Sequence, residues 1–413
     1  MVMRVGSVAC NVAAAGVAVR LVGAERYGQL VLIVALTPWL ALCALGTGER
    51  LTQVIVSAVH KTTLAQAYPT IRSVFVISGF AGLIGALGAS AVVVWGLQSG
   101  HDPAFVIGGI ITVAAIALLT PLGVSSPILI GQGLIAKDGF YKLAQPILYL
   151  VLSGALLLTE HLTREQAFVA LSLAYALSFV ASKIMGMVGS GGIAFLRHRS
   201  SPEVRRNLLQ TAWPFFIVQI AALLAFQTDR FLVNRFATSA ELGSYDFLVR
   251  IYAGLYMLFS VPLQHLWRNV AILYEEGEQH GIRRIVGTYA GGSVLFWLSV
   301  TALVVGLGPL IVSILSGGRL PLPGLSMILL VGLFFLIRGT TDVFTLTLYA
   351  TGRQRETVSY GIAHGVAHVV LAWAGGVAFG VVGVLAGQVL AFLLSSFLPF
   401  LILAFRVPAE PSA

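Results

Sequence analysis

The sequence has few charged residues and almost no cysteine. Of its 413 residues only 10% are Asp, Glu, Lys or Arg, whereas 58% are hydrophobic. A soluble domain has no use for so much apolar surface, so the composition excludes a water-soluble protein and indicates one that lies in a bilayer. Cys10 and Cys43 lie in apolar runs without CxxC or Cys/His spacing. They are predicted to be small buried side chains, and neither a disulfide framework nor a structural zinc site is expected.

Motifs for chemistry are also missing. No GxxxxGK[ST] run is present, which disfavours an ATP-driven transporter but leaves a partner ATPase open. The loops hold neither paired carboxylates nor a nucleophile constellation. The net charge of +9 comes from basic residues scattered in ones and twos, a pattern that reflects membrane topology and does not indicate nucleic-acid binding. No catalytic residue, cofactor or metal site is predicted.

Apolar runs follow one another almost from the first residue to the last. A helix needs about 20 mostly apolar residues to cross a bilayer. We therefore predict an all-α integral membrane protein with about twelve transmembrane helices. The predicted spans are residues 3–22, 29–48, 73–97, 104–134, 143–159, 166–190, 208–233, 244–266, 285–307, 323–350, 357–375 and 382–405. The first run lacks a basic leader and a cleavage site, so it is predicted to be a retained span. Two mixed segments, Glu49 to Tyr68 and Trp267 to Gly281, are predicted to be interfacial helices.

A short repeat indicates two six-helix lobes. Arg20-Leu-Val-Gly-Ala-Glu-Arg-Tyr-Gly28 follows the first span, and Arg235-Phe-Ala-Thr-Ser-Ala-Glu-Leu-Gly243 follows the seventh. Both segments place Arg eight residues before Gly with an Ala-Glu pair between them, at the same joint of each half. We predict an N-terminal lobe over residues 1–196, a basic cytoplasmic linker over 197–207, a C-terminal lobe over 208–406 and a short tail over 407–413.

The basic residues predict which side the loops face. Three of the 25 Lys and Arg residues, Lys183, Arg250 and Arg338, lie inside spans. Sixteen lie on one side of the predicted membrane, and six lie on the other: Arg20, Arg26, Arg164, Arg230, Arg235 and Arg319. Because short cytoplasmic loops accumulate Lys and Arg, this asymmetry predicts that both termini are cytoplasmic.

Several of these segments resemble the polysaccharide (O-antigen) flippases of the multidrug/oligosaccharidyl-lipid/polysaccharide exporter superfamily. The stretch from Arg20 to Gly28 resembles the joint after the first helix of these proteins. Pro214-Phe-Phe followed by 227–236, with its Asp-Arg pair, resembles the helix that opens their second half. Gly243-Ser-Tyr245 and Tyr349-Ala-Thr-Gly-Arg353 lie where the family has a Gly-x-Tyr joint and a small-residue turn. The similarity covers nearly the whole chain.

Two features depart from the family pattern. Its members usually carry a short amphipathic segment before the first helix, whereas here that helix begins almost at Met1. The second joint reads Ala237-Thr-Ser where the family has Leu-Gly-Pro.

The resemblance implies a function in glycan export. A family member in the bacterial cytoplasmic membrane would flip an undecaprenyl-pyrophosphate-linked oligosaccharide for O-antigen, capsule or exopolysaccharide, by alternating access through a basic central cavity. Its partners would be this lipid-linked oligosaccharide, the bilayer and possible glycan polymerase and glycosyltransferase enzymes. A multidrug/cation antiporter of the same superfamily is the first alternative, although it would favour acidic cavity residues. A membrane glycan polymerase or ligase is the second, although the loops are short for an acceptor site.

Charges inside spans are the first candidates for a site, because they are costly in lipid unless they face a cavity or a partner. Arg338 and Asp342 are four residues apart and are predicted to pair within one helix. Arg250 is predicted either to attract the pyrophosphate or to be neutralised by Asp246 one turn earlier. Arg250 and Arg338 are the candidates here for binding the anionic part of the cargo.

Charges at helix ends provide further candidates. Arg4, Arg20, Arg50 and Arg268 either anchor helices at the membrane interface or form a basic funnel for the anionic head group. Glu49, Asp229 and Arg230, together with Asp342, are candidates for gating or coupling. Asp229 and Arg230 are expected on different helix faces, with Arg235 or Asn234 as hydrogen-bond partner of Asp229.

Histidine and glycine patterns have simpler interpretations. His364 and His368 share a helix face, but two histidines without a third ligand favour packing or cavity lining over a metal site. Glycines at 79, 82, 85 and 88, and at 383 and 387, are predicted to permit close helix contacts.

A reporter fused after Arg406 is expected to be cytoplasmic, because an even number of spans returns the chain to the side that carries its basic loops. Alkaline phosphatase, which folds outside the cytoplasm, and green fluorescent protein, which folds inside it, provide opposite readouts. An active phosphatase at this position would contradict the predicted topology.

Overall fold

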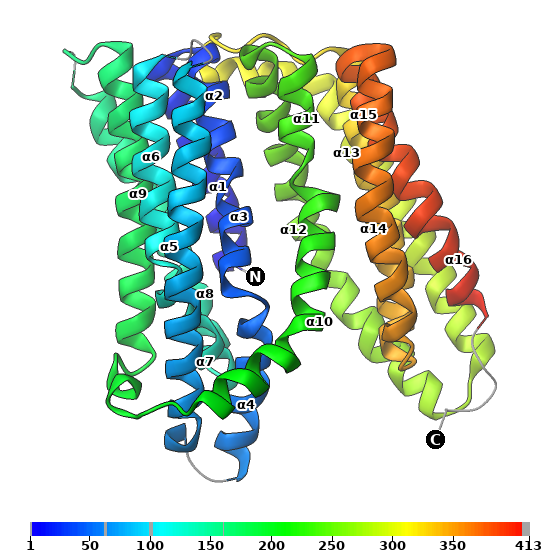
Figure 1. Ribbon diagram of the computed structural model, residues 1–413. Coiled ribbons are helices and arrows are strands. Elements are labelled where there is room, and N and C mark those ends of the chain that lie inside the picture. Colours follow the sequence, from blue (N-terminus) through cyan, green and yellow to red (C-terminus); the bar gives the residue numbers. More distant parts are fainter. Residues whose placement is uncertain (1, 62–63, 99–101, 160, 407–413) are drawn as a thin grey trace. The chain divides into compact units, whose positions relative to one another are not determined.

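The structure is a computed structural model that describes residues 2–61, 64–98, 102–159 and 161–406 (Figure 1). Within these ranges every regular element is a helix, which confirms the predicted all-α class. The contacts divide the chain into two compact units, Val2–Ile220 and Ala221–Ala413. Helix α10 begins in the first unit and ends in the second.

Polar residues fix where several helices begin. Thr163 and Thr238 each form a capping box, in which the threonine side chain accepts a hydrogen bond from the backbone N–H three residues later. The side chains of Gln166 and Glu241 accept hydrogen bonds from the threonine backbone N–H in return. Such reciprocal bonds satisfy donors that have no partner inside the helix, so both starts are defined by the local sequence.

The first unit is built from five long helices and shorter pieces between them. Helices α1, α8, α9, α6 and α5 pack in series, and Figure 1 shows α5, α6 and α9 running side by side. The elements are α1 (Val2–Val22), α2 (Ala24–Ala35), α3 (Thr37–Leu40), η1 (Ala41–Ala44), α4 (Thr47–Lys61), η2 (Leu64–Ala67), α5 (Tyr68–Gln98), α6 (Pro103–Leu118), η3 (Thr120–Val124), α7 (Ser125–Gly131), α8 (Ile135–Leu157), α9 (Arg164–Gly189), η4 (Ala194–Arg197) and α10 (Pro202–Phe226).

The second unit is organised around one central helix. Its elements are α11 (Asp229–Phe236), α12 (Ser239–Glu275), α13 (Gln279–Ser316), α14 (Leu325–Ala350), α15 (Gln354–Phe392), η5 (Leu393–Phe397) and α16 (Leu398–Phe405). Helix α14 contacts α12, α13, α15 and α16. In its most apolar window 61% of the residues are buried, the highest share among the candidate spans of the described chain. The core of this unit therefore lies along α14.

All twelve predicted spans fall on helices. Over the described residues, nine helical segments are long and apolar enough to cross a bilayer, and a tenth is the pair Pro103–Leu118 and Thr120–Gly131, bent by 46°. Gly6–Val22 is a shorter apolar helix that corresponds to the first predicted span. The last segment, Glu356–Phe405, has 50 residues and contains two of the predicted spans. This pattern is that of a multi-pass membrane protein.

Helix α15 is a hairpin of two antiparallel helices. Its backbone leaves the helical region at Phe379 and Gly380, and Gly380 has φ 62° and ψ −144°, a conformation that only glycine adopts readily. A Cβ on Gly375 would lie 2.1 Å from the carbonyl oxygen of Gly383, and one on Gly387 would lie 2.2 Å from that of Leu371. Both pairs are centred on residue 379, so the two halves run back along each other with their backbones in contact.

The structure contradicts one predicted segment and places residues of two others on helices. Trp267 to Gly281 is not a separate interfacial helix, because α12 continues without a break to Glu275 and the chain turns only at Gly277. Residues 202–207 of the predicted linker form the first turns of α10. The predicted interfacial segment from Glu49 corresponds to α4 and η2, and α4 is separated from the preceding span by left-handed residues at Leu45 and Gly46.

Most of the predicted glycine contacts are present. A Cβ on Gly82 would lie 2.3 Å from the carbonyl oxygen of Ala117, and one on Gly85 would lie 2.6 Å from Sγ of Cys43. Gly79 approaches Pro121 less closely, and Gly88 has nothing within 4 Å, so the prediction was wrong there. Small residues allow these helices to approach at the backbone, which is the main source of packing energy between helices in lipid.

The substitution Gly375→Ala is expected to destabilise the α15 hairpin, because the added methyl group would overlap the backbone of Gly383. Overpacking of this kind costs about 1–3 kcal/mol. The melting temperature of the detergent-purified protein, followed by fluorescence-detected size-exclusion chromatography, should fall.

Gly361→Ala is the matched control, since Gly361 lies in the same helix with nothing within 4 Å of the added carbon. Equal melting temperatures for the two variants would show that the hairpin contact is not tight.

Candidate functional site

Asp246 is the centre of a charge network inside the second unit. It lies on α12, and its side chain is completely buried. One carboxylate oxygen accepts a hydrogen bond from Nε of Arg230 at 3.0 Å, and the other accepts one from Nε of Arg250 at 2.5 Å. The predicted neutralisation of Arg250 by Asp246 is thus present in the structure. Arg250 is an ion-paired residue, which limits its availability to a cargo.

Asp229 and Arg230 begin helix α11, directly after a break between α10 and α11. Asp229 accepts a hydrogen bond from the Tyr245 hydroxyl at 2.5 Å, and its other oxygen lies 3.6 Å from Arg230. The expected partners Arg235 and Asn234 were therefore wrong, as was the expectation that Asp229 and Arg230 point apart. Helix α12 packs against α11, so Tyr245, which is 16 residues further along the chain, forms the hydrogen bond to Asp229 in place of Arg235 or Asn234.

This network is electrically balanced. Two carboxylates, Asp229 and Asp246, face two guanidinium groups, Arg230 and Arg250. Charges buried in low dielectric are stable only when they are paired and hydrogen-bonded in this way. The Arg230–Asp246 and Tyr245–Asp229 contacts join α11 to α12, whereas Arg250 pairs with Asp246 within α12.

Arg338 is stabilised by aromatic rings. Its guanidinium carbon lies 4.6 Å from the centroid of the Phe226 ring and 4.7 Å from that of the Tyr256 ring. The predicted close ion pair with Asp342 is absent: Asp342 accepts a hydrogen bond from the Tyr256 hydroxyl and interacts with Arg338 only at longer range. Within the described chain no carboxylate lies in ion-pair distance of Arg338. A guanidinium between two rings keeps its charge and its outward hydrogen-bond donors.

A cavity brings Arg230 and Arg338 together. Its volume is about 390 Å³, and helices α10, α11, α12, α14 and α15 of the second unit form its wall. The polar lining consists of Gln227, Asp229, Arg230, Tyr245, Arg338 and Gln388, and most of the remaining lining is aliphatic or aromatic. Guanidinium and amide donors beside aromatic rings can hold phosphate oxygens and sugar hydroxyls. The size suits a small part of a ligand.

His364 and His368 are buried beside this region on α15. His364 is within 3.0 Å of the Ser395 hydroxyl through Nδ1, and its ring packs against Phe392 at 4.6 Å. Neither ring nitrogen of His368 has a hydrogen-bond partner among the described residues. The part of the chain that the structure describes contains no cluster of three or more side chains that could hold a metal ion.

None of the candidates at helix ends is among the residues that line this cavity. Arg20 is exposed in the last turn of α1, and Arg268 is exposed on α12. Arg50 donates to Gln53 within α4, and Glu49 accepts a hydrogen bond from Gln219 at 3.0 Å. Arg4 also belongs to α1, but its side chain lies outside the described part of the structure. Their proposed funnel or gating roles stay predictions.

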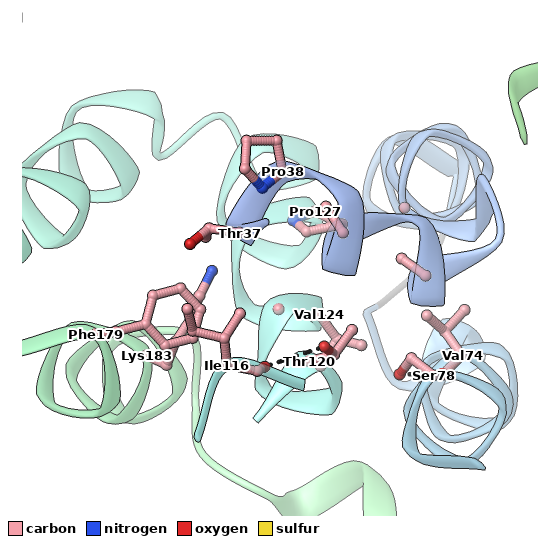
Figure 2. A pocket seen from close by; sticks show the side chains of 14 residues that line it. Thr37, Pro38, Val74, Ser78, Ile116, Thr120, Val124, Pro127, Phe179 and Lys183 are labelled. Atoms are coloured by element: carbon pink, nitrogen blue, oxygen red, sulfur yellow. Dashed lines mark hydrogen bonds between the residues drawn. The ribbon is translucent and has the colours of Figure 1, made fainter. Parts of the chain in front are cut away.

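The first unit contains a second cavity, which the sequence reasoning did not select (Figure 2). Its volume is about 280 Å³, and Lys183 on α9 contributes the only charged side chain of its lining. Figure 2 shows the Lys183 ammonium beside the Phe179 ring, on the side of the cavity where Thr37 lies. The signal was present in the sequence, since Lys183 is one of three basic residues inside predicted spans.

No family model matches the chain. A protein of Yersinia pseudotuberculosis named "Putative O-antigen export protein" is 23% identical over 196 residues, which are 47% of this chain and 45% of that protein. A Salmonella typhi protein named "Putative O-antigen transporter" is 24% identical over 206 residues, or 50% and 48% of the two chains. The chain thus matches about half the length of these curated relatives.

Solved structures match over almost the whole chain. The inward-facing conformation of a multidrug resistance MATE family transporter of the MOP superfamily has a TM-score of 0.77 and 15% identity, covering 97% of this chain and 94% of that one. The outward-facing conformation of a MATE family transporter has a TM-score of 0.63 and 16% identity, covering 98% and 93%. The chain is therefore an all-α membrane protein with the fold of the MATE transporters of the MOP superfamily.

Proposed function

We propose that this protein flips an undecaprenyl-pyrophosphate-linked oligosaccharide across the bacterial cytoplasmic membrane by alternating access. The glycan would serve O-antigen, capsule or exopolysaccharide synthesis. The transporter fold and the similarity to proteins named as O-antigen exporters support this function. Cytoplasmic termini, and a glycan polymerase and glycosyltransferases as working partners, are parts of the same proposal.

The observation that carries the proposal is the cation at Arg338. This guanidinium lines a cavity inside a membrane-embedded unit, and its close neighbours are two aromatic rings, whereas the carboxylate of Asp342 acts on it only at longer range. Its charge is therefore available to an anion that enters the cavity. A pyrophosphate has several acceptor oxygens for such a guanidinium, and Gln227 and Gln388 offer amide groups for sugar hydroxyls nearby.

One observation favours a second candidate, a drug or cation antiporter. Asp229 lines the same cavity and could in principle attract a cationic drug. Its carboxylate, however, already accepts a hydrogen bond from Tyr245 and lies 3.6 Å from Arg230. A cationic ligand would have to displace that guanidinium, so an anionic cargo fits the charge arrangement better.

A strain that lacks this protein is expected to accumulate the lipid-linked oligosaccharide on the cytoplasmic face of the membrane. The unmodified gene should restore export, whereas Arg338→Gln should restore about one tenth or less of it. The variant removes a charge-assisted hydrogen bond worth about 1.5–3 kcal/mol, and 1.4 kcal/mol corresponds to a tenfold change. Export is measured as surface glycan per cell at equal protein level.

Arg284→Gln is the matched control, because Arg284 is exposed near the start of α13 in the same unit. Full export by Arg338→Gln would remove the assigned role of Arg338. Normal export in the deletion strain, with raised sensitivity to cationic drugs, would support the antiporter and contradict the flippase.

The substitution Asp246→Asn is expected to destabilise the folded protein. A direct effect on cargo binding is expected to be smaller. It would leave Arg230 and Arg250 without their shared carboxylate, and removing one partner from a buried ion pair costs about 3–5 kcal/mol. The yield of monodisperse protein and its melting temperature should both fall. Glu275→Gln serves as the control, since Glu275 is exposed at the end of the same helix. Unchanged melting of the Asp246 variant would show that the network does not hold α11 to α12.

A further inference from the structure

The cavity of the first unit exists because two of its spans are broken. Helix α2 ends at Ala35, and α3 begins at Thr37 with Pro38 in its first turn. Helix α6 ends at Leu118, and the chain continues through η3, which contains Pro121, at an angle of 46°. Proline and tight helical turns prevent regular packing at both points. The space that remains is the cavity of about 280 Å³ shown in Figure 2.

Lys183 supplies this cavity with a basic group that has no close ion pair among the described residues, although the carboxylate of Asp138 acts on it at longer range. Its Nζ lies 5.2 Å from the centroid of the Phe179 ring, and it forms no ion pair within the described part of the chain. The carboxylate of Asp138, on the neighbouring helix α8, is held by Lys142 at 2.7 Å. An ammonium inside a span is costly without a partner, so its retention points to an anion that is supplied from outside the protein.

Hydroxyl groups complete the polar part of the cavity. Thr37 Oγ1 is buried and has no hydrogen-bond partner among the described residues. Ser78 and Thr120 also line the cavity, where each donates its hydroxyl proton to the backbone carbonyl four residues earlier. Figure 2 shows the Thr37 hydroxyl and the Lys183 ammonium on the same side of the cavity. Together they offer an ammonium and one free hydroxyl donor.

The rest of the lining is apolar and includes Pro38, Ile116, Val124 and Phe179. A free inorganic ion would gain nothing from these walls, whereas an anionic group attached to an apolar chain would bury part of that chain. Ala41 lines the cavity and is exposed, so the cavity can be reached from the surface of the unit. Its volume is below the roughly 300–1,000 Å³ of pockets for drug-sized ligands, which leaves room for a head group and a few carbons but not for an oligosaccharide.

We propose that the cavity around Lys183 binds the terminal phosphate of an amphiphile, with the phosphate on Lys183 and Thr37 and the first carbons of the tail against Pro38 and Phe179. The choice of a phosphate as the anion rests on the proposed function. The chemistry is shared by a polyprenyl pyrophosphate and by a membrane phospholipid with a terminal phosphate. Either would be held by its head group while the tail extends toward the lipid.

Binding to the purified full-length protein tests this site. The probes are farnesyl pyrophosphate and dioctanoyl phosphatidic acid, with farnesol and inorganic pyrophosphate as controls that lack either the anion or the tail. The intrinsic fluorescence of Trp39, which follows Pro38 in α3, reports occupancy after subtraction of the Trp39→Phe titration. Wild-type protein is expected to bind the amphiphilic phosphates at least about tenfold more tightly than either control. Farnesol lacks the phosphate that would contact Lys183, and inorganic pyrophosphate lacks the apolar tail that would contact the cavity wall.

Lys183→Met should weaken binding of the amphiphilic phosphates about tenfold or more and leave farnesol binding unchanged. Thr37→Val should weaken it less, without loss of stability, and it keeps the test valid if the lysine variant folds poorly. Lys137→Met is the matched control, because Lys137 is exposed in the same unit. Unchanged affinity in both cavity variants would overturn the proposal and leave Lys183 as a packing residue over Phe179.

The two probes separate the sources of the ligand. Tighter binding of farnesyl pyrophosphate assigns the cavity to the lipid carrier, and tighter binding of phosphatidic acid assigns it to a bilayer phospholipid. This result is independent of the export measurement. If the deletion strain exports glycan normally, the proposed function fails even where the Lys183 site binds phosphate. If export depends on the protein but the cavity variants bind normally, only the Lys183 site fails.

Discussion

The carboxylate of Asp246 holds two guanidinium groups inside the second unit, and the arrangement of helices α11 and α12 depends on that contact. Buried charges in a membrane protein are tolerated when opposite charges meet them at hydrogen-bond distance. Arg230 and Arg250 both pair with the carboxylate of Asp246, and the Tyr245 hydroxyl donates a hydrogen bond to Asp229. The position of α11 in turn defines one wall of the cavity that contains Arg338.

Two basic side chains are stabilised in a different way, by contact with aromatic rings. Arg338 and Lys183 lie in separate units, and each has aromatic rings as its close stabilising contacts. A ring lowers the cost of burying a cation but does not cancel its charge, since a cation–π contact is worth about 0.5–2 kcal/mol. The described residues therefore include cations held in close ion pairs, Arg230 and Arg250, and cations without a close ion pair, Arg338 and Lys183. Only the second class is expected to bind a cargo.

Hydropathy and short-range spacing predicted much of this fold. The twelve apolar runs all became helices, and the four-residue spacing of Asp246 and Arg250 gave their ion pair, because both signals depend on local periodicity. Longer-range contacts were not visible. Tyr256 and Asp342 are 86 residues apart, so nothing in the local sequence showed that a tyrosine would replace Arg338 as the partner of that carboxylate.

The cavity around Lys183 was missed for a related reason. A lysine inside a span could be read from the sequence, but the space beside it depends on breaks near Pro38 and Pro121 in two other spans. The two halves of the α15 hairpin could be predicted from the sequence, since they appear as separate apolar runs. Whether a charged residue faces a cavity is decided by its neighbours in space, which single-sequence patterns do not report.

The network around Asp246 also has a consequence for biosynthesis. Arg230 precedes its carboxylate partner by 16 residues, and Asp229 precedes Tyr245 by the same distance. A nascent α11 therefore begins with a carboxylate and a guanidinium, and such charges are costly in a membrane unless partners meet them. The partners are supplied only when the first turns of α12 have been made. We therefore expect insertion of α11 and α12 together, as one hairpin, to cost less than insertion of α11 alone.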